Sequence, residues 1–229
     1  MSTEVESTNK CKFCGKVFRR LSTLSVHNCE LKRRWMQENE TGVRLGFHAF
    51  CRFYELTQGK TNKTYADFVK SSFYSAFVKF GQYLVQIRPI NISKFIDWVI
   101  QNNIKLDCWT KDEHYHKFVI DLIPKESFDE ALERTLKEMQ VWADESGHHL
   151  SDFFRKNTAS QVCSLITEGR ISPWVLFNCK SGHEFLEQLH TVQLNVLIQY
   201  LNPDTWTTRF HKYAEEVTML KSILKDSNL

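Results

Sequence analysis

The sequence predicts an all-α fold for residues 41–229, a multi-helix globular domain that follows a short cysteine-containing module. Composition is the first reason, because 8 Gly and 4 Pro stand against 17 Phe, 7 Tyr and 6 Trp, which disfavours disorder and turn-rich β folds. The second is that apolar residues recur at spacings of three and four. The third is that helix start signals precede these apolar runs.

Five such start signals are visible. In three of them a Ser or Thr has a carboxylate three positions later, the spacing at which two side chains satisfy each other's backbone donors. These pairs are Thr64 with Asp67, Thr110 with Glu113 and Ser127 with Glu130. In the other two, Ser172 and Asn202 each precede a proline suited to the first helical position. We therefore expect short and medium helices in close succession.

Two longer helices are expected within this domain. Residues 127–145 carry one apolar stripe with charged residues largely off it, which is typical of a half-buried surface helix. Residues 184–201 are more apolar, with Phe185, Leu189, Val192, Val196 and Tyr200 in register, and are expected to form a central helix. No strand-like alternation of useful length appears after residue 40.

The N-terminal part begins with residues 1–10, a polar tail expected to be disordered, and continues with CKFCGKVFRRLSTLSVHNC from Cys11 to Cys29. Two cysteines separated by two residues, followed after twelve residues by a histidine and a further cysteine, offer the thiolate and imidazole ligands that zinc prefers. The predicted Zn²⁺ ligands are Cys11, Cys14, His27 and Cys29.

This stretch resembles the Cys/His zinc finger of DNA-binding proteins. Phe18, Leu24 and His27 match the two core residues and the first histidine of that finger. The resemblance implies a ββα module, but it ends differently, because only Asn28 separates His27 from Cys29. Residues two apart on a helix point about 200° away from each other. We therefore expect an altered ββα finger over residues 11–29 whose helix ends at His27, with Asn28 in the left-handed conformation.

Positive charge is concentrated in and beside the predicted finger. Residues 1–35 contain eight Lys or Arg and three acids, a net charge of +5, whereas the whole chain sums to +3. A basic helical connector is expected over residues 30–40. The candidate nucleic-acid-binding residues are Lys12, Lys16, Arg19, Arg20, Thr23, Lys32, Arg33 and Arg34. One finger addresses only about three base pairs, so we expect sequence-tolerant phosphate contacts, with DNA as the preferred partner.

Two alternatives stay open at this stage. The finger could be purely structural, in a protein–protein adaptor or inhibitor. The segment from Gly169 to Phe185 could be either an aromatic and arginine surface for a partner or a short core helix.

An enzyme is not expected, because the sequence has no Gly-rich phosphate loop, no Gly-x-Ser-x-Gly elbow and no His-Glu-x-x-His motif. A second metal site on Asp112, Glu113 and His116 would lack convergent carboxylates. The four cysteines outside the finger, Cys51, Cys108, Cys163 and Cys179, are expected to be reduced core thiols of an intracellular, cytoplasmic protein. No apolar run is long enough to span a bilayer, so no membrane contact is expected.

The order of the whole chain resembles a family of zinc-finger proteins of T-even-type tailed phages. The matching features are the finger, the Lys-Arg-Arg-Trp connector of residues 32–35, a Phe-Tyr-rich helical region, and the run from Gly169 to Trp174. The resemblance implies a phage protein in the bacterial host cytoplasm that is linked to the phage's DNA transactions. The predicted role is a non-enzymatic accessory factor that also binds a protein of a replication, transcription or packaging assembly.

Overall fold

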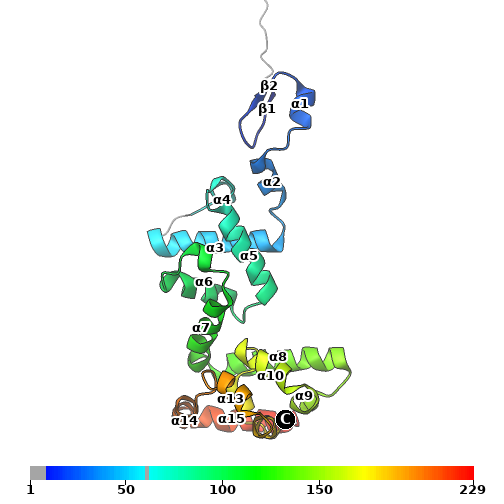
Figure 1. The fold of residues 1–229 in the computed structure, drawn as a ribbon, viewed down its shortest axis with the longest axis vertical. Coiled ribbons are helices and arrows are strands. Elements are labelled where there is room, and N and C mark those ends of the chain that lie inside the picture. The colour runs from blue at the N-terminus through cyan, green and yellow to red at the C-terminus, as the bar shows by residue number, and fades with distance from the viewer. Residues whose placement is uncertain (1–8, 60–61) are drawn as a thin grey trace, which may run out of the picture. The chain divides into compact units, whose positions relative to one another are not determined.

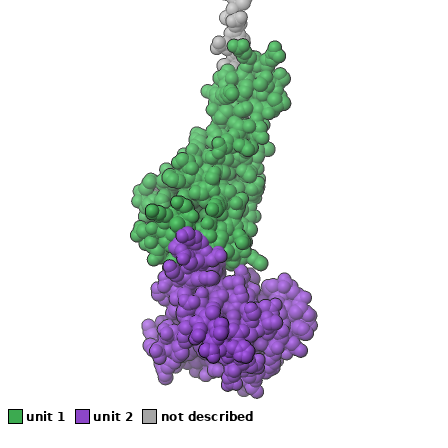
Figure 2. All heavy atoms as spheres, viewed as in Figure 1, with its two compact units in different colours: residues 1–88, 92–110 green, residues 89–91, 111–229 purple. Residues whose placement is uncertain are grey.

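The computed structural model describes residues 9–59 and 62–229 and confirms the all-α fold class with a small N-terminal finger (Figure 1). The chain divides into two compact units (Figure 2). Unit 1 comprises residues 1–88 and 92–110, and unit 2 comprises residues 89–91 and 111–229. The sequence predicts a single domain over residues 41–229, so the division near residue 110 is seen only in the structure. In the described residues no helix has both the length and the apolar character needed to cross a membrane.

Unit 1 starts with the ββα finger. Strands β1 (Asn9–Lys10) and β2 (Val17–Phe18) pair antiparallel, and α1 (Leu21–Ser25) follows. The two strands are joined by a tight turn in which Gly15 has φ +75°, a conformation that glycine adopts readily. Residues 1–8 of the predicted tail lie outside the described residues. Asn9 and Lys10 belong to the finger instead, since their strand pairing places Cys11 at the hairpin's end.

Four α-helices follow the connector helix α2 (Glu30–Met36) in the described residues of unit 1. They are α3 (Thr41–Gln58), α4 (Tyr65–Lys70), α5 (Tyr74–Ile87) and α6 (Ile92–Gln101), and a 3₁₀ turn (Leu106–Cys108) follows. Thr64 and Asp67 form the predicted capping box at α4. The core is aromatic, with Phe50, Phe68, Phe77, Phe80 and Trp109 each at most 1% exposed.

Helices α3 and α5 approach each other closely at glycines. A Cβ atom on Gly81 of α5 would lie 1.9 Å from the carbonyl oxygen of Gly42 and 2.5 Å from the nitrogen of Gly46, both on α3. A Cβ on Gly46 would in turn lie 2.6 Å from the carbonyl oxygen of Phe77. The two backbones are therefore in direct contact, and any side chain at these positions would push the helices apart.

Unit 2 contains nine α-helices in its described residues, most of them short. They are α7 (Asp112–Leu122), α8 (Phe128–Ser146), α9 (Phe153–Lys156), α10 (Ala159–Thr167), α11 (Pro173–Leu176), α12 (Lys180–Glu187), α13 (Thr191–Leu197), α14 (Pro203–Lys212) and α15 (Ala214–Asp226). Two 3₁₀ turns, Ile123–Lys125 and Leu150–Asp152, connect some of them.

Most of the predicted helix starts in unit 2 are confirmed. Ser127, Ser172 and Asn202 cap α8, α11 and α14 through their side chains. The predicted cap at Thr110 is wrong, because α7 is preceded by Lys111, which makes no side-chain cap. Asp112 and Glu113 lie in the first turn of α7, where carboxylates favour the positive end of the helix dipole without a capping side chain.

The expected central helix over residues 184–201 is also wrong. The chain breaks between α12 and α13, where the His190 amide donates to the Gln193 side chain at 3.0 Å and so starts a new helix. As a result, the predicted stripe is split. Phe185 and Leu189 are buried, whereas Val192 and Val196 are 76% and 49% exposed.

The segment from Gly169 to Phe185 belongs to the core of unit 2, as the second of the two alternatives predicts. Trp174 and Cys179 are 1% and 2% exposed. Arg170 is paired with Glu138 and Glu168 at 3.3 and 2.8 Å. The aromatic and arginine side chains of this segment therefore pack and form ion pairs within unit 2.

A buried carboxylate links this segment to α8. Glu126 is 3% exposed and accepts two hydrogen bonds from the Arg134 guanidinium, at 2.6 and 2.9 Å. The Ser172 hydroxyl donates to the same carboxylate at 2.8 Å. The charge of Glu126 is thus both paired and hydrogen-bonded, which a buried carboxylate requires.

Gly81→Ala is expected to destabilise unit 1 by about 1–3 kcal/mol, because the added methyl group has no space against the α3 backbone. Urea unfolding followed by circular dichroism measures the loss, with Gln86→Ala, at an exposed position of the same helix, as the control. Equal midpoints for the two variants would contradict the close approach of α3 and α5.

Glu126→Ala is expected to destabilise unit 2 by about 3–5 kcal/mol, because it leaves the largely buried Arg134 guanidinium without its counter-charge. Glu133→Ala, at an exposed position of α8, removes the same charge and should change stability by less than about 0.5 kcal/mol. The comparison uses the thermal midpoint of each full-length variant. If both variants unfolded at the same temperature, the buried pair would have no such role.

Candidate metal centre

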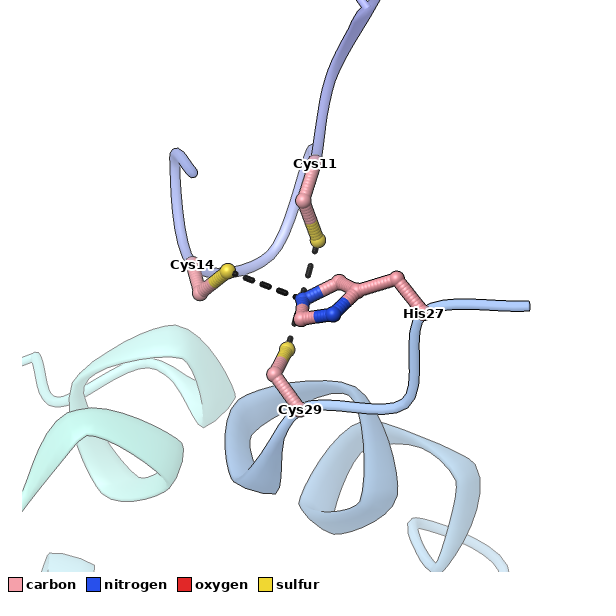
Figure 3. A group of neighbouring side chains, drawn as sticks. All are labelled: Cys11, Cys14, His27 and Cys29. Carbon is pink, nitrogen blue, oxygen red and sulfur yellow. Dashed lines mark hydrogen bonds between the residues drawn. The ribbon is translucent and has the colours of Figure 1, made fainter. Parts of the chain in front are cut away.

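The four predicted ligands converge on one point in the finger (Figure 3). Their donor atoms all lie within 4.8 Å of one another. The Cys11 and Cys29 sulfur atoms are 4.0 Å apart, and the Cys14 sulfur lies 3.3 Å from His27 Nε2. No other group of three or more His, Cys, Asp or Glu side chains converges in this way within the described part of the chain, including Asp112, Glu113 and His116.

The first two ligands lie on the turn of the β hairpin. Cys11 directly follows β1, its amide donates to the Lys16 carbonyl at 2.8 Å, and its carbonyl accepts from the Gly15 amide at 2.9 Å. The backbone amides of Cys14 and Phe13 also donate to the Cys11 sulfur and hold its pKa at about 7, below its usual value. These two amides thus favour the thiolate form of Cys11, the form that binds a metal, whereas desolvation and the neighbouring Cys11 and Cys29 sulfur atoms raise the pKa of Cys14.

The last two ligands lie in a break between two helices. Helix α1 ends at Ser25, two residues before the predicted end at His27, and its C-cap Val26 is right-handed. Asn28 does not adopt the left-handed conformation predicted for it, since its φ is not positive. The extended backbone of Cys29 instead starts a second helix, α2. Because neither His27 nor Cys29 is within a helix, both can face the same point despite their spacing of two.

Cys29 is at once a predicted ligand and the N-cap of α2. Its sulfur accepts a hydrogen bond from the Lys32 amide at 3.4 Å. The Lys32 ammonium group donates back across the break to the His27 carbonyl at 3.2 Å. The finger and the connector helix are therefore one structural piece.

The donor set fits a tetrahedral zinc ion. With Zn–S bonds of about 2.3 Å and Zn–N bonds of about 2.0 Å, tetrahedral ligands lie about 3.8 Å apart between two sulfurs and about 3.5 Å apart between sulfur and nitrogen. The observed separations of 4.0 and 3.3 Å are close to these values. Three thiolates and one imidazole are soft ligands typical of zinc, and four protein ligands are typical of a structural site.

The finger's small hydrophobic core is built around the same histidine. Phe18 and Leu24, the two predicted core residues, are both partly buried. The Phe18 ring centroid lies 4.6 Å from that of His27. Such a core is too small to hold the module by itself, so a bound metal would complete its stability.

The predicted nucleic-acid-binding residues fall into two groups. Six are exposed, namely Lys12, Lys16, Arg19, Arg20, Thr23 and Arg33. Lys32 is half-buried and bonded to His27 as described above. The side chain of Arg34 is only 15% exposed and points inward.

Arg34 and its neighbour Trp35 hold α2 against α4 and α5. The Arg34 guanidinium donates to the carbonyls of Val69 and Ser71 at 2.7 and 3.2 Å and lies 4.4 Å over the Tyr74 ring. It also pairs with Glu30.

The Tyr65 hydroxyl donates to the Arg34 carbonyl at 2.9 Å, and the Tyr65 ring lies 5.1 Å from that of Trp35. The sequence pattern does not mark Tyr65 for this role, although an isolated Trp in a polar connector is a signal of packing.

The site and fold together define a class: an altered ββα finger with a Cys₃His cluster, joined by a capped helix to an all-α body. The chain matches no protein-family model, no curated protein and no solved structure. The resemblance to the T-even phage family therefore stays a prediction.

Cys14→Ala is expected to abolish stoichiometric metal binding, because a tetrahedral site loses one of its four ligands. Zinc analysis of the purified protein should give about one ion per chain in the parent and close to none in the variant. Cys108→Ala removes a cysteine outside the cluster and should keep the ion. In Cys14→Ala most of the helical circular-dichroism signal should remain, since α3 to α15 carry none of the four ligands. Loss of the entire signal would show that the finger is integral to the helical core.

Proposed function

We propose that this protein is a zinc-binding, non-enzymatic accessory factor that contacts nucleic acid, with DNA preferred, through its finger and connector. One observation carries the proposal: residues 9–29 contain five Lys or Arg and no Asp or Glu, and all five are exposed on the small ββα module that holds the metal cluster. Zinc with three thiolates and one imidazole has a formal charge of −1. The finger therefore keeps a clear positive excess toward phosphates.

The contacts are proposed to be tolerant of sequence. Arg20, Thr23 and Val26 occupy the positions that face bases in the finger that this module resembles, but α1 has only five residues. A helix of five residues is about 7.5 Å long, and a single finger reads about three base pairs. The exposed cations are better suited to phosphates, which carry no sequence information.

The helical body is proposed to bind a protein of the same assembly. Four apolar side chains on or next to α13 are strongly exposed, namely Val192 (76%), Leu194 (43%), Val196 (49%) and Ile198 (50%). Val192 and Val196 are four residues apart and share one face of the helix, and Leu194 and Ile198 share another; apolar side chains left exposed on a short helix are typical of protein contacts. The resemblance to the phage family suggests a replication, transcription or packaging complex in the bacterial host cytoplasm.

A second candidate function is favoured by the finger's own surface. Val17, Leu21 and Val26 are 61%, 67% and 79% exposed. Three apolar side chains on so small a module would suit a protein partner as well as a groove of DNA. Under this alternative the protein is an adaptor or inhibitor whose finger is structural.

Reversing four exposed charges of the finger and connector should separate the two functions. The variant carries Lys12→Glu, Lys16→Glu, Arg20→Glu and Arg33→Glu, and its affinity for labelled DNA is measured by fluorescence anisotropy across salt concentrations. We expect at least tenfold weaker binding at low salt and a slope of log K against log salt reduced by about 0.9 for each lost phosphate contact.

The matched control reverses Lys117, Lys137, Lys156 and Lys221, four exposed lysines of unit 2, and so makes the same change in net charge. Equal weakening by both variants would mean that binding follows net charge alone. No binding by the parent even at low salt would rule out the nucleic-acid function and favour the adaptor.

A further inference from the structure

Two hollows lie beside the metal cluster within unit 1. The larger, of about 640 Å³, runs along α2 to the first turn of α5, and its lining includes Glu30, Lys32, Arg33, Arg34, Met36 and Tyr74. The smaller, of about 320 Å³, lies in the finger, and its lining includes Lys10, Cys11, Lys12, Phe13, His27 and Lys32. Lys32 lines both, so the hollows adjoin at this side chain.

Basic side chains line part of the wall of each hollow. Lys10 and Lys12 face the smaller one, Arg33 faces the larger one, and Lys32 lies between them. The one acidic residue among the lining residues, Glu30, is paired with Arg34, which neutralises it. A chain of phosphates along this path would meet a cation at each step.

Each hollow also offers an apolar surface next to its cations. Met36 lines the larger hollow with 75% of its side chain exposed, although it lies on a short polar helix where an exposed methionine has no packing role. Phe13 lines the smaller hollow, with the Lys12 ammonium group 5.1 Å from its ring centroid. Aromatic and flexible apolar side chains beside cations are the surface on which unpaired bases stack.

The size of the hollows favours a single strand over a duplex. Volumes of about 640 and 320 Å³ are in the range of small-molecule sites and leave room for about one or two nucleotides. A duplex keeps its bases inside a cylinder about 20 Å wide and cannot enter them; only its outer phosphates could reach the rims. Arg20 and Thr23 occupy positions that face a duplex in the DNA-binding finger that this module resembles. Neither residue lines a hollow.

We infer that the nucleic acid bound by this protein is single-stranded and runs from the finger hollow past Lys32 into the α2–α5 hollow, with phosphates on Lys12, Lys32 and Arg33 and bases against Phe13 and Met36. This inference rests on the proposed function and names its substrate class. Because a single strand exposes its bases and bends into concave surfaces, it can use the cations and the apolar groups together.

The test compares two double variants of the full chain that change net charge equally. Lys12→Glu with Arg33→Glu alters one cation in each hollow, whereas Arg19→Glu with Arg20→Glu alters two exposed cations that line neither. The probes are labelled 20-nucleotide oligo-dT, oligo-U and a 20-base-pair duplex. Zinc content and circular dichroism are checked first, and Lys12→Gln with Arg33→Gln replaces the first variant if it loses zinc.

We expect the parent to bind at least one of the single strands ten times more tightly than the duplex. The hollow variant should lose about tenfold in that affinity, and the Arg19/Arg20 variant less than threefold. Met36→Ala should weaken single-strand binding several-fold without changing its salt slope, because its contribution is not ionic.

Equal or tighter duplex binding, together with a larger loss from the Arg19/Arg20 variant, would overturn the inference and leave the proposed nucleic-acid function intact. Binding of none of the three probes would remove both. A preference for oligo-dT or for oligo-U would assign the strand to DNA or to RNA, and either supports the single-stranded path.

Discussion

The thiol of Cys29 is the point on which the N-terminal half of unit 1 depends. Its sulfur completes the donor cluster with Cys11, Cys14 and His27, and it also accepts the Lys32 amide at the start of α2. In the finger that this module resembles, one helix carries both late ligands. Here a helix ends, two ligands follow within three residues, and another helix begins. The metal site therefore lies at the junction of two helices and not on the side of one.

This junction determines where the positive charge is presented. Helix α2 places successive side chains about 100° apart, so Arg33 and Arg34 point in different directions and have different roles. Arg34 is directed to the carbonyls of Val69 and Ser71, while Arg33 is exposed and lines the α2–α5 hollow. One basic residue thus fixes the helix and the next remains available to a ligand. Within a single helical turn, the Lys-Arg-Arg run therefore contains both the residue that anchors α2 and a cation that remains exposed.

Local signals were enough to predict the fold class and the donor cluster. Ligand spacing is a property of a short segment, and capping at Thr64, Ser127 and Asn202 depends on residues at most three positions away. The errors have equally physical reasons. The apolar repeat of residues 184–201 continues across a break that a capping contact at His190 creates, so periodicity alone could not show it.

Other features could not be predicted because they depend on distant contacts. The inward position of Arg34 is set by carbonyls 35 and 37 residues further along the chain. The conformation of Asn28 depends on the helix that begins two residues later, which the finger resemblance did not include. The close approach of α3 and α5 involves glycines whose role appears only when both backbones are placed.

The docking of α2 also has a consequence for the order of events during synthesis. The four donor residues are complete at position 29, whereas the groups that hold Arg34 and Trp35 belong to residues 65–71. On a ribosome the last donor residue, Cys29, emerges 36 to 42 residues before these anchoring groups. Because N-terminal elements fold first during translation, we expect the finger to acquire its ion while α2 is still undocked. The nascent chain then carries a finished metal module before it has a helical body to attach it to.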